Sequence, residues 1–329
     1  MDVTRALRKG SLILGAASLV ACGGGGSGNS DGGDTVAALA CESPDLPVYT
    51  LEMDTQNYAG QTIDISVGSD IGGMLGLYSD LEEGFTLVDN VRGNLVSQSG
   101  GKAGSIQCKG GGTATVSYLG SGTDTDEQWS FDQCEVATGA GSVRLSGSYR
   151  YVDRQTAQTN TSQTREGFED YNITGVAIGS GADSSDEALV IKGRSGFVFE
   201  YEFDSEDGCV TEAISGLEYK RGQRYVALSA AETRLDRAGS STRIGIQGKL
   251  VGSSINGYVN IGTPTSILFE DSQTCPVEGI ISVSSNGEAQ VRFGSSAGGT
   301  APATGVAVWV NGQSESFDNC QDIGVAPLY

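Results

Sequence analysis

The sequence has no histidine, few basic residues and a small share of large apolar residues. Without an imidazole among its 329 residues, it has no Ser-His-Asp triad, no Cys-His dyad and no His-ligated zinc site. Leu, Ile, Val and Phe make up roughly 22% of the chain, just above the level at which a highly charged chain is expected to stay unfolded. We therefore expect a thin hydrophobic core that needs further stabilisation.

Acidic residues outnumber basic ones by 41 Asp and Glu to 20 Lys and Arg, which gives a net charge of −21. A body this acidic repels phosphate backbones, so nucleic acid is not an expected partner. We interpret the charge as a source of solubility rather than as a site for a cationic partner.

The first 21 residues have the three-part layout of a secretory signal. Arg5, Arg8 and Lys9 precede an apolar run from Ser11 to Val20, and small residues follow up to Cys22. The apolar run is too short to span a bilayer as a helix. Residues 1–21 are therefore predicted to be a signal peptide.

The segment Leu19-Val20-Ala21-Cys22 resembles a bacterial lipobox. This resemblance implies that Cys22 becomes the lipid-attachment site, with acyl chains such as palmitate holding the protein on a membrane. Because Gly23 rather than Asp follows the cysteine, the resemblance also implies the outer membrane. Residues 22–40 are rich in Gly and Ser and predict a flexible tether.

Six further cysteines are present, and a secreted chain with an even number of thiols is expected to pair them. They are Cys41, Cys108, Cys134, Cys209, Cys275 and Cys320. Six thiols allow fifteen pairings. None is spaced as Cys-x-x-Cys, which argues against a redox centre or a zinc knuckle.

Local similarity suggests that the body, residues 41–329, has two related halves of about 41–200 and 201–329. Residues 112–118 align with 287–293, and Ser130–Cys134 aligns with Ser316–Cys320. Each block runs from a Cys through two expected strands to Phe-Asp-x-Cys, an arrangement that brings its two sulfurs together. We predict Cys108–Cys134 and Cys275–Cys320, and Cys41–Cys209 by elimination.

Alternating apolar and polar residues predict strands along most of the body. The segments are 62–67, 113–119, 143–152, 188–191, 197–203, 224–228, 243–250, 258–261, 280–283, 289–293 and 306–310. Asn286-Gly287, Asn311-Gly312 and Asn256-Gly257 predict hairpin turns. Only Gly72–Glu83 and Leu228–Arg237 hint at helix, and both also fit strand or loop. The sequence thus predicts an all-β antiparallel body, either a sandwich or a strongly curved, barrel-like sheet.

The C-terminal part resembles proteobacterial outer-membrane lipoproteins of unknown function. The similarity rests on Cys275-Pro276, the strand and turn that follow, and Phe317-Asp318-Asn319-Cys320, with a second copy at Phe131–Cys134. Relatives often carry an Asp-rich insertion between these motifs, whereas Ser295–Thr304 contains no Asp. The resemblance implies a location and a β architecture, and here no metal loop.

Two strings match catalytic motifs without their chemical context. Gly294–Gly298 reads Gly-x-Ser-x-Gly, but no histidine exists to accept the serine proton. Ser99–Lys102 reads Ser-x-x-Lys, but the required later Lys-Thr-Gly is missing because Lys249 is the last lysine. We expect no catalytic residue and no enzymatic activity.

Two other features leave alternatives open. Clustered acids at 124–127, 183–187 and 204–207 suit either a calcium ion or, our preference, solvated turns. The aromatic face of Phe197, Phe199, Tyr201 and Phe203 fits either core or the lining of an apolar-ligand cavity. We expect no bound metal and no cofactor.

These observations predict a lipid-anchored cell-envelope protein without enzymatic activity that acts as a structural or interaction module at the outer membrane. Its partners would be the membrane, through the lipid anchor, and an envelope protein or glycan. The alternative is a carrier or chaperone of a lipid or other apolar ligand in the envelope.

Overall fold

The computed structural model describes residues 41–51, 68–138, 141–179, 185–203, 207–270, 273, 275–298 and 305–320. The expected signal peptide, Cys22, the tether and the expected strand at 62–67 lie outside these ranges.

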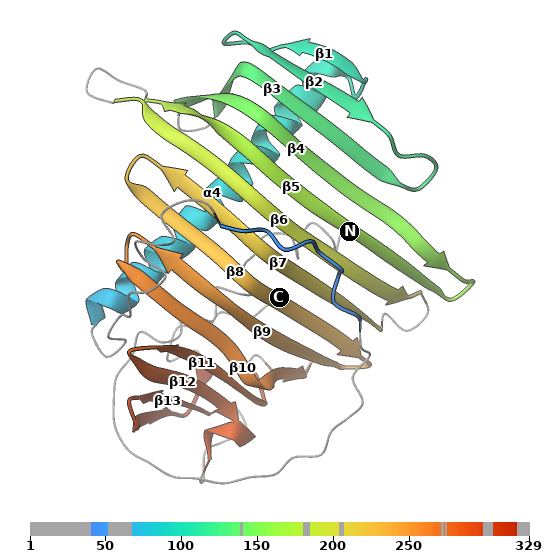
Figure 1. The fold of residues 1–329 in the computed structure, drawn as a ribbon. Coiled ribbons are helices and arrows are strands. Elements are labelled where there is room, and N and C mark those ends of the chain that lie inside the picture. The colour runs from blue at the N-terminus through green and yellow to red at the C-terminus, as the bar shows by residue number, and fades with distance from the viewer. Residues whose placement is uncertain are drawn as a thin grey trace.

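Fourteen strands form one antiparallel sheet in which the spatial order is the chain order (Figure 1). They are β1 (Gly104–Gln107), β2 (Thr113–Tyr118), β3 (Thr125–Thr138), β4 (Gly141–Gln158), β5 (Ser162–Ile178), β6 (Glu187–Glu202), β7 (Gly208–Arg221), β8 (Arg224–Ala238), β9 (Ser241–Gly252), β10 (Gly257–Glu270), β11 (Glu278–Ser285), β12 (Gly287–Gly294), β13 (Val306–Val310) and β14 (Gln313–Phe317). The curved sheet does not close, and β1 and β14 are its edges. The all-β prediction is confirmed, in its curved-sheet form.

Short turns connect most neighbouring strands, as the Asn-Gly dipeptides predict. Asn311 and Gly312, between β13 and β14, have φ of 48° and 81°, the left-handed geometry that a two-residue hairpin needs. Asn256, before β10, has φ of 48°. Asn286 joins β11 directly to β12. In this last turn the positive φ, 129°, is on Gly287. Asn and Gly accept positive φ at low cost, so these turns fix the register of the paired strands.

One long helix, α4 (Gly68–Ser99), contains the expected helical segment 72–83 and extends well beyond it. Its buried side chains include Val88, Val91 and Leu95, three and four residues apart, which places them on one face of the helix. The other segment with a helical hint, Leu228–Arg237, is part of β8. Its pairing with β7 and β9 along its length outweighs the weak helical spacing.

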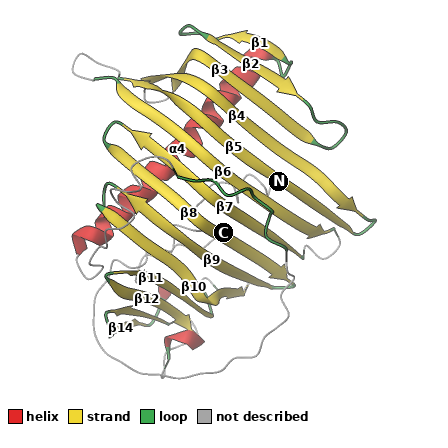
Figure 2. Cartoon of the chain, in the orientation of Figure 1, coloured by secondary structure: helices red, strands yellow, loops and turns green. Residues whose placement is uncertain are grey.

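The two faces of the sheet carry different covers. Figure 2 shows α4 (red) behind the sheet and residues 41–51 (green) crossing in front of it. We call residues 41–51 the strap, the face under it the strap face, and the opposite face the helix face. Because side chains alternate along a strand, each strand contributes to both faces.

The main core lies on the helix face. It runs continuously from α4 and β1 to β13, with fully buried Trp129, Leu145, Tyr219 and Phe293 among its largest side chains. A smaller cluster on the strap face joins Tyr225, Ala227 and Val251 to Leu51 of the strap and to Tyr258. A single layer of strands thus obtains two apolar contacts from segments that precede it in the chain.

The two aligned sequence blocks lie near opposite ends of the sheet. The segment between Cys108 and Cys134 contains β2 and most of β3, whereas that between Cys275 and Cys320 contains four strands, β11 to β14. The boundary near residue 200 falls inside β6. The division into related halves stays a prediction from the sequence.

We predict opposite effects for two glycine substitutions in α4. At Gly84 an added Cβ would lie 2.8 Å from Cδ2 of Tyr219, which is buried in the sheet, whereas at Gly93 nothing lies within 4 Å. Gly93→Ala should therefore raise the free energy of unfolding by about 1 kcal/mol through helix propensity. Gly84→Ala should lower it by about 1–3 kcal/mol through overpacking. Urea denaturation measures both, and equal stabilisation by the two variants would contradict this packing.

Candidate functional site

The strap is fixed to the sheet at its first residue. Cys41 forms a disulfide with Cys209 of β7, with the two Cα atoms 5.6 Å apart. The carbonyl oxygen of Cys41 accepts hydrogen bonds from Oγ1 of Thr211 (3.3 Å) and Nη2 of Arg234 (3.0 Å). One covalent bond and two hydrogen bonds thus fix the first residue of the strap to the sheet.

The rest of the strap packs closely against glycines on the strap face. A Cβ at Gly196 would lie 2.5 Å from Cδ2 of Leu46, and one at Gly216 would lie 3.1 Å from Cδ1 of Tyr49. The strap therefore packs onto backbone where larger side chains would exclude it.

The other two predicted disulfides are also present. Cys108, just after β1, pairs with Cys134 of β3, and Cys275, before β11, pairs with Cys320, after β14. All six cysteines are buried. Cys41, Cys209 and Glu200 come close enough to hold a metal ion, but the two sulfurs are bonded to each other and cannot act as thiolate ligands.

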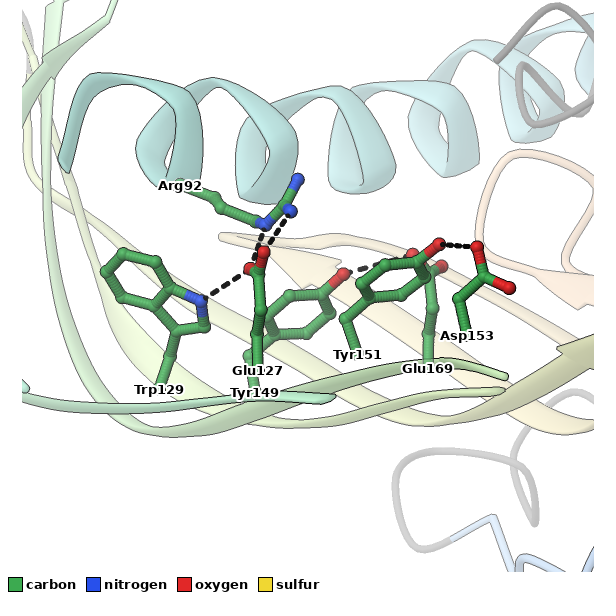
Figure 3. Close-up of polar contacts among 7 residues, drawn as sticks. All are labelled: Arg92, Glu127, Trp129, Tyr149, Tyr151, Asp153 and Glu169. Atoms are coloured by element: carbon green, nitrogen blue, oxygen red, sulfur yellow. Dashed lines mark hydrogen bonds and ion pairs between the residues drawn. The ribbon is translucent and has the colours of Figure 1, made fainter. Parts of the chain in front are cut away.

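A polar cluster lies between α4 and the sheet (Figure 3). Nε and Nη2 of Arg92, on α4, donate to the two carboxylate oxygens of Glu127 on β3 at 2.6 and 2.8 Å. Nε1 of Trp129 donates to the same carboxylate at 3.2 Å. Burial lowers the pKa of Arg92, but the hydrogen bonds and charge of Glu127 outweigh burial and raise it above its ordinary value. The guanidinium thus stays charged and connects the helix to the sheet.

Two buried tyrosines extend this cluster to the next strands. The hydroxyls of Tyr149 on β4 and Tyr171 on β5 donate to Glu169 at 3.0 and 2.6 Å. Burial, and then the nearby charge of Glu169, raises the pKa of both hydroxyls well above the ordinary value of 10.0. They therefore act as hydrogen-bond donors and not as nucleophiles at neutral pH.

The cluster ends at a third tyrosine. Tyr151 donates to Asp153 at 3.2 Å, and Nε of Arg165 donates to the same carboxylate at 2.8 Å. The guanidinium of Arg92 lies 5.5 Å from the ring of Tyr151. Each carboxylate in the cluster thus receives donors from the protein itself, and the arrangement favours attachment of α4 over proton transfer to a substrate.

The acidic cluster at 124–127 is neither a calcium loop nor a solvated turn. Asp126 and Glu127 belong to β3, are 7% exposed, and point to opposite faces of the sheet. Asp126 binds Arg150 through two hydrogen bonds of 2.8 and 3.0 Å, which holds the pKa of Asp126 below its ordinary value. Asp124 accepts from the backbone N–H of Gln155 at 3.0 Å.

One described member of each of the other two acidic groups also has a protein partner. Glu187 binds Arg221 at 2.7 Å, and Asp207 accepts from the N–H of Gly239 at 2.6 Å. Asp183, Asp204 and Glu206 lie outside the described residues.

The two catalytic-looking strings have structural roles. Ser295–Ala297 forms a short 3₁₀ helix, and Oγ of Ser296 accepts from the N–H of Gly279 at 3.2 Å. Ser99 is the last residue of α4, and its hydroxyl donates to the carbonyl of Val96 at 3.1 Å. Neither serine has the partner that nucleophilic attack would require.

The aromatic face of β6 changes from core to surface along the strand. Phe197 packs against the main core, Phe199 and Tyr201 are half-buried and stack with centroids 6.0 Å apart, and Phe203 is 40% exposed. The core interpretation thus applies to Phe197, whereas the far end of this face lies at the surface.

The sequence pattern did not reveal the helix–sheet polar cluster. Apolar alternation did not predict β3 or β5, because their core-facing positions include Glu127 and Glu169, and only the block that ends at Cys134 implied a strand in the β3 region. The sequence does carry a signal for this cluster, because aromatic residues alternate with polar ones in these strands. They are Trp129, Tyr149 and Tyr171.

In the part of the chain that the structure describes, no helix combines the length and hydrophobicity of a membrane span. No protein-family model, no curated protein and no solved structure matches the chain.

We predict that Glu127→Gln lowers the free energy of unfolding by about 1.5–3 kcal/mol, because it leaves the half-buried Arg92 without its charge partner. The matched control is Glu135→Gln, whose partner Arg144 is 43% exposed, and it should cost less than about 1 kcal/mol. Chemical denaturation at neutral pH measures both. Equal losses would contradict the role assigned to Glu127.

Alkaline pH should destabilise the protein. Because the folded pKa of Tyr149 and Tyr171 lies above the unfolded value of 10.0, their contribution is complete below pH 10 and is lost as pH rises towards the folded pKa. The double variant Tyr149→Phe, Tyr171→Phe should show a shallower decrease in urea midpoint between about pH 9 and pH 11. An unchanged slope would show that other groups cause the alkaline unfolding.

Proposed function

We propose that this chain is a lipid-anchored protein of the cell envelope, held at the outer membrane through Cys22, whose non-catalytic β body serves as a structural or interaction module. The observation that carries the proposal is the Cys41–Cys209 disulfide, which fastens the end of the expected tether to the centre of the sheet.

The disulfides support an oxidising location. Three buried pairs use all six cysteines of the body, and such bonds persist outside the reducing cytosol. This agrees with the signal-peptide layout of residues 1–21. A thin core gains stability from them, at about 2–4 kcal/mol for each bond.

The position of Cys41 supports a tethered body. Residues 23–40 would give an end-to-end distance of roughly 20–25 Å as a flexible chain, enough to hold the sheet clear of lipid headgroups. Because Cys41 is bonded to β7, a pull on the tether acts on the middle of the sheet and leaves the strap in place.

The difference between the two faces of the sheet also supports a module that binds a partner on its surface. The helix face carries α4 and the polar cluster, whereas the strap face presents grooves of about 720 and 680 Å³ beside the strap. The carrier alternative draws on the exposed end of the aromatic face at Phe203. It has less support, because α4 occupies the helix face and leaves a space of about 280 Å³ that includes Glu83 and Arg221.

The test is metabolic labelling with an alkyne-bearing palmitate followed by membrane fractionation. The parent protein should take up the label and sediment with outer membranes, and Cys22→Ala should lose both properties. The matched control is the double variant Cys41→Ala, Cys209→Ala, which removes a nearby cysteine and its partner and should keep both label and location.

Label on Cys22→Ala, or an unlabelled parent in the soluble fraction, would refute the anchor. A lipid that co-purifies with detergent-free protein in native mass spectrometry would favour the carrier instead.

A further inference from the structure

The larger groove of the strap face is built from two rows of polar side chains that cross five strands, β2 to β6. In each row the residues lie directly opposite one another on neighbouring strands. The first row is Thr115, Ser130, Ser148, Asn172 and Lys192, and the second is Ser117, Gln128, Arg150, Asp170 and Arg194.

The dimensions of the rows follow from sheet geometry. Neighbouring strands lie about 4.8 Å apart, so each row is roughly 19 Å long, and the rows are roughly 7 Å apart. The ring repeat of a linear pyranose chain is close to the strand spacing. An extended oligosaccharide laid across the strands would therefore meet a new pair of polar side chains at about each sugar.

The chemistry of the rows changes from one end to the other. At the β2–β4 end the rows present exposed hydroxyls and one amide, which both donate and accept hydrogen bonds. These side chains are Thr115, Ser117, Gln128, Ser130 and Ser148. At the β5–β6 end the groove has Lys192, Arg194 and Asp170, with Arg150 alongside. Three basic residues and one acid line this groove, although the whole chain has twice as many acids as bases.

The two arginines are held in fixed positions. Both guanidiniums lie over the ring of Phe168, at 5.4 and 5.5 Å from its centroid. Arg150 binds Asp126 on the neighbouring strand β3, and Arg194 pairs with Asp170. Lys192 lies opposite Glu218 of β7. Because side-chain positions are set before a ligand arrives, little conformational entropy is lost on binding.

One residue of the strap, Tyr49, lines the groove near its β6 end. Tyr49 packs over Gly216, next to Arg194 in the register of β6 and β7, and lines the groove with the two rows. A tyrosine ring offers an apolar face with a polar tip, which suits the C–H face of a sugar ring.

We propose that this groove binds an extended acidic oligosaccharide, with uronic-acid carboxylates at the Arg150, Lys192 and Arg194 end and sugar hydroxyls along the neutral rows. The partial neutralisation of the two arginines by Asp126 and Asp170 suits separated carboxylates better than a polyphosphate. The net charge of −21 also disfavours a dense polyanion. This proposal names a ligand class for the interaction module. It rests on the proposed function only for the place, the cell envelope, where the protein would meet the ligand.

Isothermal titration calorimetry of the purified mature protein with pentagalacturonate, cellopentaose and pentaglutamate tests this. We expect pentagalacturonate to bind at least about tenfold more tightly than either the neutral sugar or the acidic peptide. Lys192→Gln and, separately, the exposed Gln128→Ala should each weaken pentagalacturonate binding by about fivefold or more. Lys249→Gln is the matched control, because Lys249 lies on β9 against Tyr258, away from this groove.

Each outcome decides between these readings. Equal binding of pentaglutamate would show plain charge attraction and overturn the proposal, as would no binding of pentagalacturonate or an equal loss in Lys249→Gln. Circular dichroism of each variant verifies the fold, and Asn172→Ala replaces Lys192→Gln if that variant unfolds. Anchoring through Cys22 is measured in a separate experiment. One of the two proposals can therefore be refuted while the other stands.

Discussion

The structure depends on the packing of one long helix against one face of a single-layer sheet. Fourteen strands in chain order satisfy each other's backbone hydrogen bonds, but a sheet alone leaves its apolar side chains in water. α4 covers part of the helix face with Val88, Val91 and Leu95, and Gly84 lets it approach Tyr219 closely. Arg92 and Glu127 add a fixed polar contact, which specifies where along the sheet the helix lies.

The strap and the disulfides compensate for a small apolar content in a different way. Cys41–Cys209 joins residues 168 positions apart and fixes a segment that has no helix or strand of its own. Gly196 and Gly216 give that segment direct access to the sheet backbone. Tyr49 of the same segment lines the polar groove. The strap therefore both stabilises the body and contributes to the proposed binding surface.

Charged residues inside the sheet explain much of what the sequence analysis missed. The strand predictions succeeded where apolar residues alternate cleanly, as in β2, β9 and β12. The alternation breaks in β3 and β5, where Glu127 and Glu169 occupy positions that face the helix side. Glu127 is tolerated there because Arg92, 35 residues away in the chain, donates to it. Glu169 is tolerated because two tyrosine hydroxyls of β4 and β5 donate to it.

The fold class, the hairpin turns and the disulfide pairs could be read from the sequence. They follow from period-two alternation, from the positive φ that Asn and Gly accept, and from two sequence blocks that each begin and end with a cysteine. The pair Cys41–Cys209 then followed by elimination. Only the tertiary structure decided that the sheet is a single open layer, that α4 and the strap take opposite faces, and that Asp126 and Glu127 are paired inside a strand rather than exposed in a turn. These outcomes depend on contacts between segments far apart in the chain, which no local pattern of residues encodes.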